Sequence, residues 1–97
     1  MVGKKTKIKI LIVDDQIEVR ELVQVTLEIG DYQILSAENG QEALDIWQAW
    51  QPHLIWMDMR MPVMDGYEAT RRIKSSTKGQ ATVIVALTAS ALEEDRA

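Results

Sequence analysis

Short apolar runs alternate along the chain with segments in which apolar residues recur every three or four positions. Three runs, residues 10–13, 53–57 and 82–87, are wholly or mostly apolar, a pattern typical of strands that are covered on both faces. Residues 32–37 form a further stretch with β-prone side chains. The pattern therefore predicts four strands.

The segments between these strands carry helical signals. Residues 15–18 resemble a capping box with an acidic cap, and Gly30 ends the helix that follows. A second helix is expected between the turn at residues 39–40 and Pro52, and a third after Gly66. One set of side chains on each helix is predicted to face inward: Val19, Leu22, Val23, Thr26 and Leu27; Ala43, Leu44, Trp47 and Trp50; and Ala69, Thr70 and Ile73.

Strands and helices alternate, which predicts an α/β fold built on a doubly wound parallel sheet with helices on both faces. Residues 75–80 are expected to form a polar connector, and residues 91–97 to begin a fourth helix. With 97 residues, the chain is predicted to form a single domain, 1–97, because a second core needs a longer chain. Residues 1–6 are expected to be a disordered lead-in.

The chain is 46% hydrophobic and 27% charged, with a formal net charge of −4. This is the composition of an ordinary globular domain, and the acidic balance argues against a general nucleic-acid binder. The absence of cysteine excludes disulfides and thiolate metal sites and suits a reducing cytoplasm. No apolar run approaches the roughly 18 residues that a membrane span requires. We therefore expect a cytoplasmic domain that does not enter the membrane.

Oxygen-bearing side chains follow three of the predicted strands. Asp14 and Asp15 end the first strand, Asp58 ends the third and Thr88 follows the fourth. The carboxyl ends of parallel strands meet at one edge of a sheet, where folds of this kind bind ligands. Carboxylates gathered there repel one another unless a cation intervenes, and magnesium prefers oxygen ligands together with phosphate. The pattern indicates a magnesium site beside an acceptor for a phosphoryl group.

Each of these residues also has a purely structural interpretation. Asp15 could cap the helix that follows it, Asp58 could start a turn, and Thr88 taken alone favours an ordinary strand residue. A helix cap needs one carboxylate, however, and the sequence places two in succession. An ionised Asp58 directly after an apolar strand is also costly unless its charge is compensated. For the acidic residues the functional interpretation is favoured.

The segments that carry these residues resemble the receiver domain of two-component response regulators. The resemblance rests on the pair Asp14 and Asp15, on residues 58–66 (Asp-Met-Arg-Met-Pro-Val-Met-Asp-Gly) and on residues 87–89 (Leu-Thr-Ala). With the matching order of strands and helices it covers essentially the whole chain, and the ordered set is far more specific than any one piece. Residues 61–66 are especially similar to receivers attached to hybrid histidine kinases. The resemblance implies a flavodoxin-like fold.

The resemblance also implies a role for each site residue. Asp58 is expected to accept a phosphoryl group from a phosphohistidine of a histidine kinase or a histidine phosphotransfer domain, and Thr88 to contact that group as a switch. The domain would assist its own phosphorylation and dephosphorylation without being an enzyme. Four groups are expected to hold magnesium: the carboxylates of Asp14, Asp15 and Asp58 and the backbone carbonyl of Arg60. Three positions are expected to modulate the lifetime of the phosphoryl group: Arg60, Ala89 and Ser90.

The sequence departs from the family pattern near its end. A receiver would continue through a fifth strand and a fifth helix, and would supply there a lysine that pairs with the phosphoryl group and an aromatic residue that reports activation. No residue of this sequence matches either role, so a receiver without its last strand and helix is expected. Residues 82–87 would then form an apolar sheet edge without proline or charge. Self-association through this strand is expected.

Two other functions share these motifs. A phosphatase similar to the haloacid dehalogenase family would also form an aspartyl phosphate, but that family has a second aspartate two residues after the nucleophile, where this sequence has Arg60. A pseudo-receiver would act through protein contacts alone and would never be phosphorylated. The complete acidic set argues against a pseudo-receiver and the missing lysine argues for it, so both alternatives stay open.

Overall fold

Four parallel strands form one sheet in the computed structural model, which describes residues 7–61 and 63–87. The strands are β1 (Ile8–Val13), β2 (Tyr32–Ala37), β3 (Leu54–Asp58) and β4 (Val83–Leu87), and they lie in the order β2-β1-β3-β4. The predicted parallel sheet is confirmed, with β4 at one edge of it. The expected lead-in at residues 1–6, the site residues Thr88, Ala89 and Ser90, and the helix expected over residues 91–97 lie outside the described residues.

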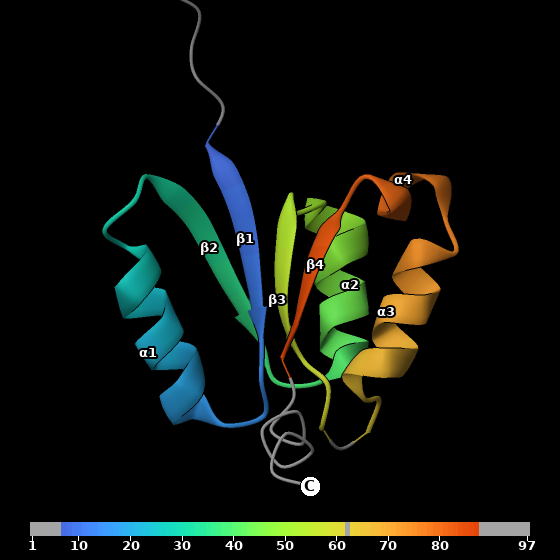
Figure 1. The fold of residues 1–97 in the computed structure, drawn as a ribbon, viewed down its shortest axis with the longest axis horizontal. Coiled ribbons are helices and arrows are strands. Elements are labelled where there is room, and N and C mark those ends of the chain that lie inside the picture. Colours follow the sequence, from blue (N-terminus) through green and yellow to red (C-terminus); the bar gives the residue numbers. More distant parts are fainter. Residues whose placement is uncertain (1–6, 62, 88–97) are drawn as a thin grey trace, which may run out of the picture.

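Helices cover both faces of this sheet. They are α1 (Ile17–Leu27), α2 (Gly40–Trp50), α3 (Gly66–Lys74) and the single turn α4 (Thr77–Gln80). α1 lies on one face, and α2 and α3 lie together on the other (Figure 1), which is the predicted doubly wound arrangement. In the part of the chain that the structure describes, no helix is long and apolar enough to cross a membrane.

The short helix α4 falls within the segment that was expected to be a connector. Its N-cap is Ser76, whose hydroxyl accepts a hydrogen bond from the Gly79 amide at 2.9 Å. One turn is too short to show a helical period, so the hydrophobic pattern could not predict it. α4 ends at Gln80, shortly before β4 begins at Val83.

The main hydrophobic core lies between the sheet and the pair α2 and α3. Central strands β1 and β3 supply the most deeply buried side chains on this side, and the helices pack small and aromatic residues against them. Met59 and Met61, which follow β3, complete the core. The members are Leu11, Val13, Ala37, Ala43, Leu44, Trp47, Ile55, Met57, Met59, Met61, Ala69 and Ile73.

The opposite face, under α1, is covered less completely. Ile10 and Ile12 of β1 are buried there, but no residue of α1 itself is buried. Leu22 lines a cavity together with Trp56 of β3, so it lies on the predicted inward side of α1, but it is 67% exposed because that side is not covered. A cavity of about 240 Å³ separates part of α1 from Trp56 of β3. Helical spacing shows which side of a helix is apolar, but not whether another element covers it.

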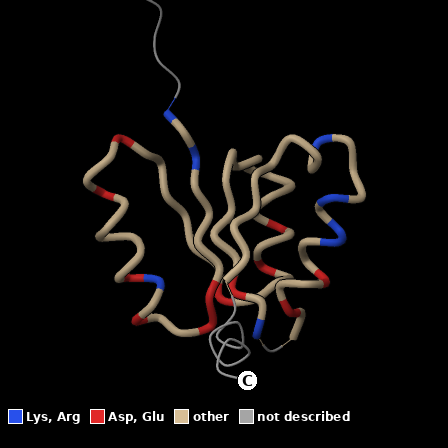
Figure 2. The backbone as a smooth tube through the Cα atoms, viewed as in Figure 1, with Lys and Arg blue, Asp and Glu red and all other residues tan. Residues whose placement is uncertain are grey.

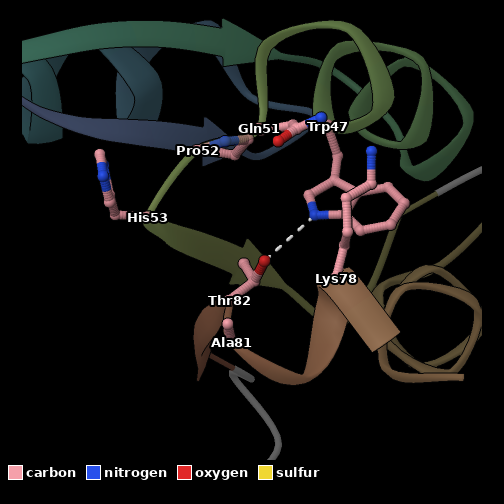
Figure 3. A pocket seen from close by; sticks show the side chains of 7 residues that line it. All are labelled: Trp47, Gln51, Pro52, His53, Lys78, Ala81 and Thr82. Atoms are coloured by element: carbon pink, nitrogen blue, oxygen red, sulfur yellow. Dashed lines mark hydrogen bonds between the residues drawn. The ribbon is translucent and has the colours of Figure 1, made fainter. Parts of the chain in front are cut away.

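A hydrogen bond joins α2 to the start of β4 at the end of the sheet where β3 and β4 begin. The indole Nε1 of Trp47 donates to the Thr82 hydroxyl at 3.1 Å (Figure 3). The bond borders a pocket of about 330 Å³. His53 lies beside this pocket and accepts the Lys9 amide at Nδ1, at 2.9 Å. The bond gives this histidine a structural role.

Candidate functional site

The carboxyl ends of β1 and β3 bring three carboxylates together. Val13 of β1 pairs with Met57 of β3. The next residue of each chain segment, Asp14 and Asp58, therefore lies at the same end of the sheet. One carboxylate oxygen from each of Asp14, Asp15 and Asp58 lies within 4.8 Å of the others. Acidic residues accordingly gather at this end of the sheet (Figure 2). The predicted meeting of these three residues is confirmed.

Asp14 is fixed by three hydrogen bonds in the loop between β1 and α1. Its amide donates to the Ala37 carbonyl at 3.1 Å, its Oδ1 accepts from the Gln16 amide at 2.9 Å, and its carbonyl oxygen accepts from Nη1 of Arg20 at 2.7 Å. The side chain of Asp14 is almost fully buried. The loop is therefore held at a residue of the acidic cluster itself.

The expected capping role of Asp15 is wrong. The N-cap of α1 is Gln16, one residue later, and the Gln16 side chain makes no capping bond. The Asp14 carboxylate accepts a hydrogen bond from the Gln16 amide. Asp15 is left exposed at the edge of the cluster, which removes the structural interpretation of this residue and favours the functional one.

Asp58 ends β3 and is half-buried. Its Oδ1 accepts a hydrogen bond from the Arg60 amide at 3.1 Å, so the chain that follows the strand orients the carboxylate. Arg60 therefore contacts the Asp58 carboxylate through its backbone amide. The expected role of its carbonyl as a metal ligand stays a prediction.

Burial raises the pKa of both Asp14 and Asp58 above the ordinary carboxyl value. The amides of Gln16 and Arg60 lower these pKa values in part. The negative charge of the neighbouring carboxylates raises them further. The cluster is therefore electrostatically unfavourable in its fully ionised form.

The donor set fits a hard divalent cation. Its three carboxylates come from two adjacent strand ends, and oxygen ligands of this kind are those that magnesium prefers. A bound cation would offset the mutual repulsion that the pKa values show. Oδ1 of Asp14 accepts a hydrogen bond from the Gln16 amide. The other carboxylate oxygen of Asp14 could bind an ion, or a water molecule that is bound to the ion.

Gly40 and Gly66 hold the loop that follows Asp58, a role that no pattern in the sequence predicted. The Gly40 amide donates to the Met64 carbonyl at 2.9 Å. A Cβ at Gly66 would lie 2.4 Å from the carbonyl oxygen of Asp58. Within this loop Val63 adopts a φ of 71°, a costly conformation for a β-branched residue. The surrounding backbone contacts fix the loop in this conformation.

Asp65 has a structural role at the start of α3. It is the N-cap of α3, and its side chain accepts the Glu68 amide at 2.9 Å. Its neighbour Gly66 is the first residue of the helix. Sequence reasoning identified this turn and helix start, but not that Gly66 touches the backbone of Asp58.

Within residues 7–61 and 63–87, every lysine has its contacts away from the cluster. Lys7 pairs with Asp31, Lys9 donates to the Trp50 carbonyl, and Lys74 donates to the Thr82 carbonyl. Lys78 lines the pocket beside Trp47. Lys74 and Lys78 therefore have their contacts in other parts of the fold.

Comparison with known proteins identifies the family. Residues 10–97 match the family described as the response regulator receiver domain. The chain belongs to this receiver family. The order of strands and the acidic cluster are those that the resemblance led us to expect.

The curated relatives are longer than this chain. The chain is 40% identical over 87 residues to an uncharacterized 14.6 kDa protein of Leptolyngbya boryana, covering 90% of this chain and 66% of that protein. It is 38% identical over 96 residues to the phosphate regulon transcriptional regulatory protein PhoB of Pseudomonas aeruginosa, covering 99% of this chain and 40% of that regulator. The chain thus spans less than two thirds of the length of either relative.

Solved receiver structures share the fold. The receiver domain of sensor histidine kinase PA1611 from Pseudomonas aeruginosa, with a magnesium ion in its active site cleft, has a TM-score of 0.84 and 34% identity, covering 94% of this chain and 75% of that chain. The receiver domain of Saccharomyces cerevisiae Ssk1, crystallised with the histidine phosphotransfer protein Ypd1, has a TM-score of 0.79 and 38% identity, covering 92% and 68%. The flavodoxin-like receiver fold is therefore confirmed for this chain.

Proposed function

We propose that this receiver domain accepts a phosphoryl group from a phosphohistidine onto Asp58, with magnesium held by Asp14, Asp15 and Asp58. The observation that carries the proposal is the convergence of these three carboxylates within 4.8 Å in a chain of the receiver family. A role in two-component signalling follows from the family. The metal, the phosphoryl donor and the acceptor residue are the proposed part.

In the proposed transfer, a carboxylate oxygen of Asp58 bonds to phosphorus while the bond between phosphorus and the donor imidazole breaks. The electron pair leaves with the imidazole nitrogen, which then takes up a proton. The Arg60 amide holds Oδ1 of Asp58, so the carboxylate is oriented before the donor arrives. Bound magnesium would supply positive charge against the charge that gathers on the phosphoryl oxygens.

A histidine kinase or a histidine phosphotransfer protein is the proposed partner. The Ssk1 receiver, which shares this fold, was crystallised with such a phosphotransfer protein. We propose no nucleic-acid contact by this domain, because its net charge is −4. The proposal places the domain in the cytoplasm, where receivers typically act, and makes it a phosphoacceptor that assists its own phosphorylation and dephosphorylation, not an independent enzyme.

Phosphorylation is expected on incubation with acetyl phosphate and magnesium, read as a phosphoryl-sized gain in intact mass. The gain should disappear in Asp58→Asn, which keeps an oxygen for the Arg60 amide but cannot act as the nucleophile. Asp65→Asn is the matched control, because this carboxylate caps α3 outside the cluster, and it should be phosphorylated like the wild type. An unmodified wild type that binds magnesium would favour the pseudo-receiver, and an equal gain in Asp58→Asn would place the acceptor elsewhere.

We also propose that a polypeptide of these 97 residues associates with itself through β4. In the described part of the chain β4 is an edge strand, and Val83 and Val85 are 56% and 36% exposed. Such an apolar edge is a template for pairing with another strand.

Light scattering should therefore show a molar mass above that of the monomer. The double variant Val83→Lys and Val85→Lys should return it to the monomer, because edge lysines oppose strand pairing. Leu35→Lys, on β2 at the other edge and 43% exposed, is the control that should leave association unchanged. A wild type that is monomeric at every concentration would contradict the proposal.

A further inference from the structure

Arg20 links helix α1 to the backbone of the acidic cluster. It lies in the first half of α1 and is only partly exposed. Its Nη1 donates to the carbonyl oxygen of Asp14 at 2.7 Å, a short bond to a charged donor of the kind that is stronger than a bond between neutral groups. This arginine belongs to no part of the site predicted from the sequence.

The bond completes a set of anchors on Asp14. The amide of Asp14 donates to Ala37 of β2, and its Oδ1 accepts the amide of Gln16. Those two bonds fix the nitrogen and the side chain of Asp14. Arg20 fixes the third group, the carbonyl of the peptide unit that joins Asp14 to Asp15.

The orientation of this peptide unit determines where Asp15 points. Asp15 is exposed and stands at the N-terminal side of α1, whose N-cap lacks a side-chain capping bond. Rotation of the peptide unit between Asp14 and Asp15 would turn the Asp15 carboxylate away from Asp14 and Asp58. A hydrogen bond to the carbonyl oxygen opposes that rotation.

We infer that Arg20 is a positioning residue, which holds the peptide unit between Asp14 and Asp15 so that the Asp15 carboxylate stays in the cluster. The inference rests on the proposed function, because the cluster that Arg20 is inferred to hold in place is the proposed magnesium site. Arg20 acts through backbone geometry and contacts neither the metal nor the phosphoryl group.

An electrostatic role for Arg20 predicts the opposite sign. A positive charge beside a cation site repels the cation, so its removal alone should tighten magnesium binding. Loss of the backbone contact should instead weaken binding, because the Asp15 carboxylate is no longer held. The direction of the change in magnesium affinity therefore separates the two roles.

The test compares Arg20→Met with the wild type by calorimetric titration with magnesium. Methionine keeps the apolar stem and removes both the donors and the charge. We expect about 10–100-fold weaker binding, the range typical when an outer residue that orients a metal ligand is lost. Arg20→Lys, which keeps a donor on a long stem, should recover part of the affinity. Arg72→Met removes the same charge from an exposed arginine of α3 and should leave the affinity unchanged.

Amide hydrogen exchange without magnesium supplies a readout that does not depend on the proposed function. The Gln16 amide, which donates to Asp14, should exchange faster in Arg20→Met than in the wild type. Arg20→Gln serves if Arg20→Met does not fold, with the same expectations. Unchanged exchange together with equal or tighter magnesium binding would overturn the inference. A wild type that binds no magnesium would overturn the proposed function, while the exchange result would still decide the role of Arg20 in the loop.

Discussion

Replacing Gly66 by alanine is expected to lower the free energy of unfolding by about 1–3 kcal/mol, the usual cost of forcing atoms into a packed site. The added Cβ would lie 2.4 Å from the Asp58 carbonyl oxygen and 2.8 Å from the Met59 Cα. Both neighbours are backbone atoms, so neither can swing aside. Helix propensity alone would favour alanine by roughly 1 kcal/mol. The steric overlap therefore outweighs helix propensity, and Gly66→Ala is expected to be less stable than the wild type.

Denaturant unfolding of the two proteins measures this difference. Gly30→Ala is the matched control, because the new Cβ there would meet ring atoms of the Tyr32 side chain, and Tyr32 is 39% exposed and can rotate away. Gly66→Ala should also be phosphorylated more slowly, since relief of the overlap displaces Asp58. If Gly66→Ala unfolds at the same denaturant concentration as the wild type, the close approach of α3 to β3 is not rigid.

Neutralising one carboxylate of the cluster is expected to have opposite effects on stability and on metal binding. Without metal at pH 7, Asp58→Asn and Asp14→Asn should each raise the free energy of unfolding by roughly 0.5–2 kcal/mol, as the removal of unfavourable charge commonly does. Asparagine keeps an oxygen for the Arg60 or the Gln16 amide, so no hydrogen bond is lost. Magnesium affinity should fall at least tenfold, so that saturating magnesium reverses the order of stabilities.

The direction of the pKa shifts sets the pH dependence of this effect. Burial raises the folded-state pKa of Asp14 and Asp58 above the ordinary aspartate value of 3.8, so the folded state binds protons more tightly than the unfolded state does. The destabilisation is absent below pH 3.8 and develops as pH rises through the raised pKa values.

Melting curves without metal across this range check the prediction. The advantage of Asp58→Asn should be present at pH 7 and should vanish at pH values below 3.8, where the wild-type carboxyl is also protonated. Asp65→Asn should differ from the wild type by no more than about 0.5 kcal/mol at either pH, as surface changes usually do. Variants that melt below the wild type at pH 7 without metal would show that the cluster is not strained.

Local sequence signals were sufficient for the sheet and the acidic residues. Each central strand is an apolar run that ends in aspartate, at Val13 before Asp14 and at Met57 before Asp58. Parallel pairing brings such strand ends together whatever the details of the loops. The boundaries of β2, Tyr32–Ala37, are likewise those that its β-prone residues predicted.

The features that sequence could not supply are contacts between segments that are distant in the chain. Gly66 against Asp58 and Gly40 against Met64 act through backbone atoms, and no side-chain pattern reports such an approach. The capping signal at Asp15 was misplaced by one residue, because α1 has Gln16 as its N-cap and the Gln16 side chain makes no capping bond. The exposure of Leu22 depends on which elements cover that face of the sheet, and the residue spacing of α1 does not contain this information.

Asp58 is distant in sequence from the adjacent pair Asp14 and Asp15, and the three carboxylates meet only when β1 and β3 pair. An unfolded chain therefore has no comparable cluster, and an ion that binds there binds the native state alone. By mass action, a ligand at 100 times its dissociation constant stabilises the native state by about 2.7 kcal/mol. If the proposed magnesium site is correct, magnesium would thus stabilise the native state of the domain in addition to its proposed role in phosphorylation.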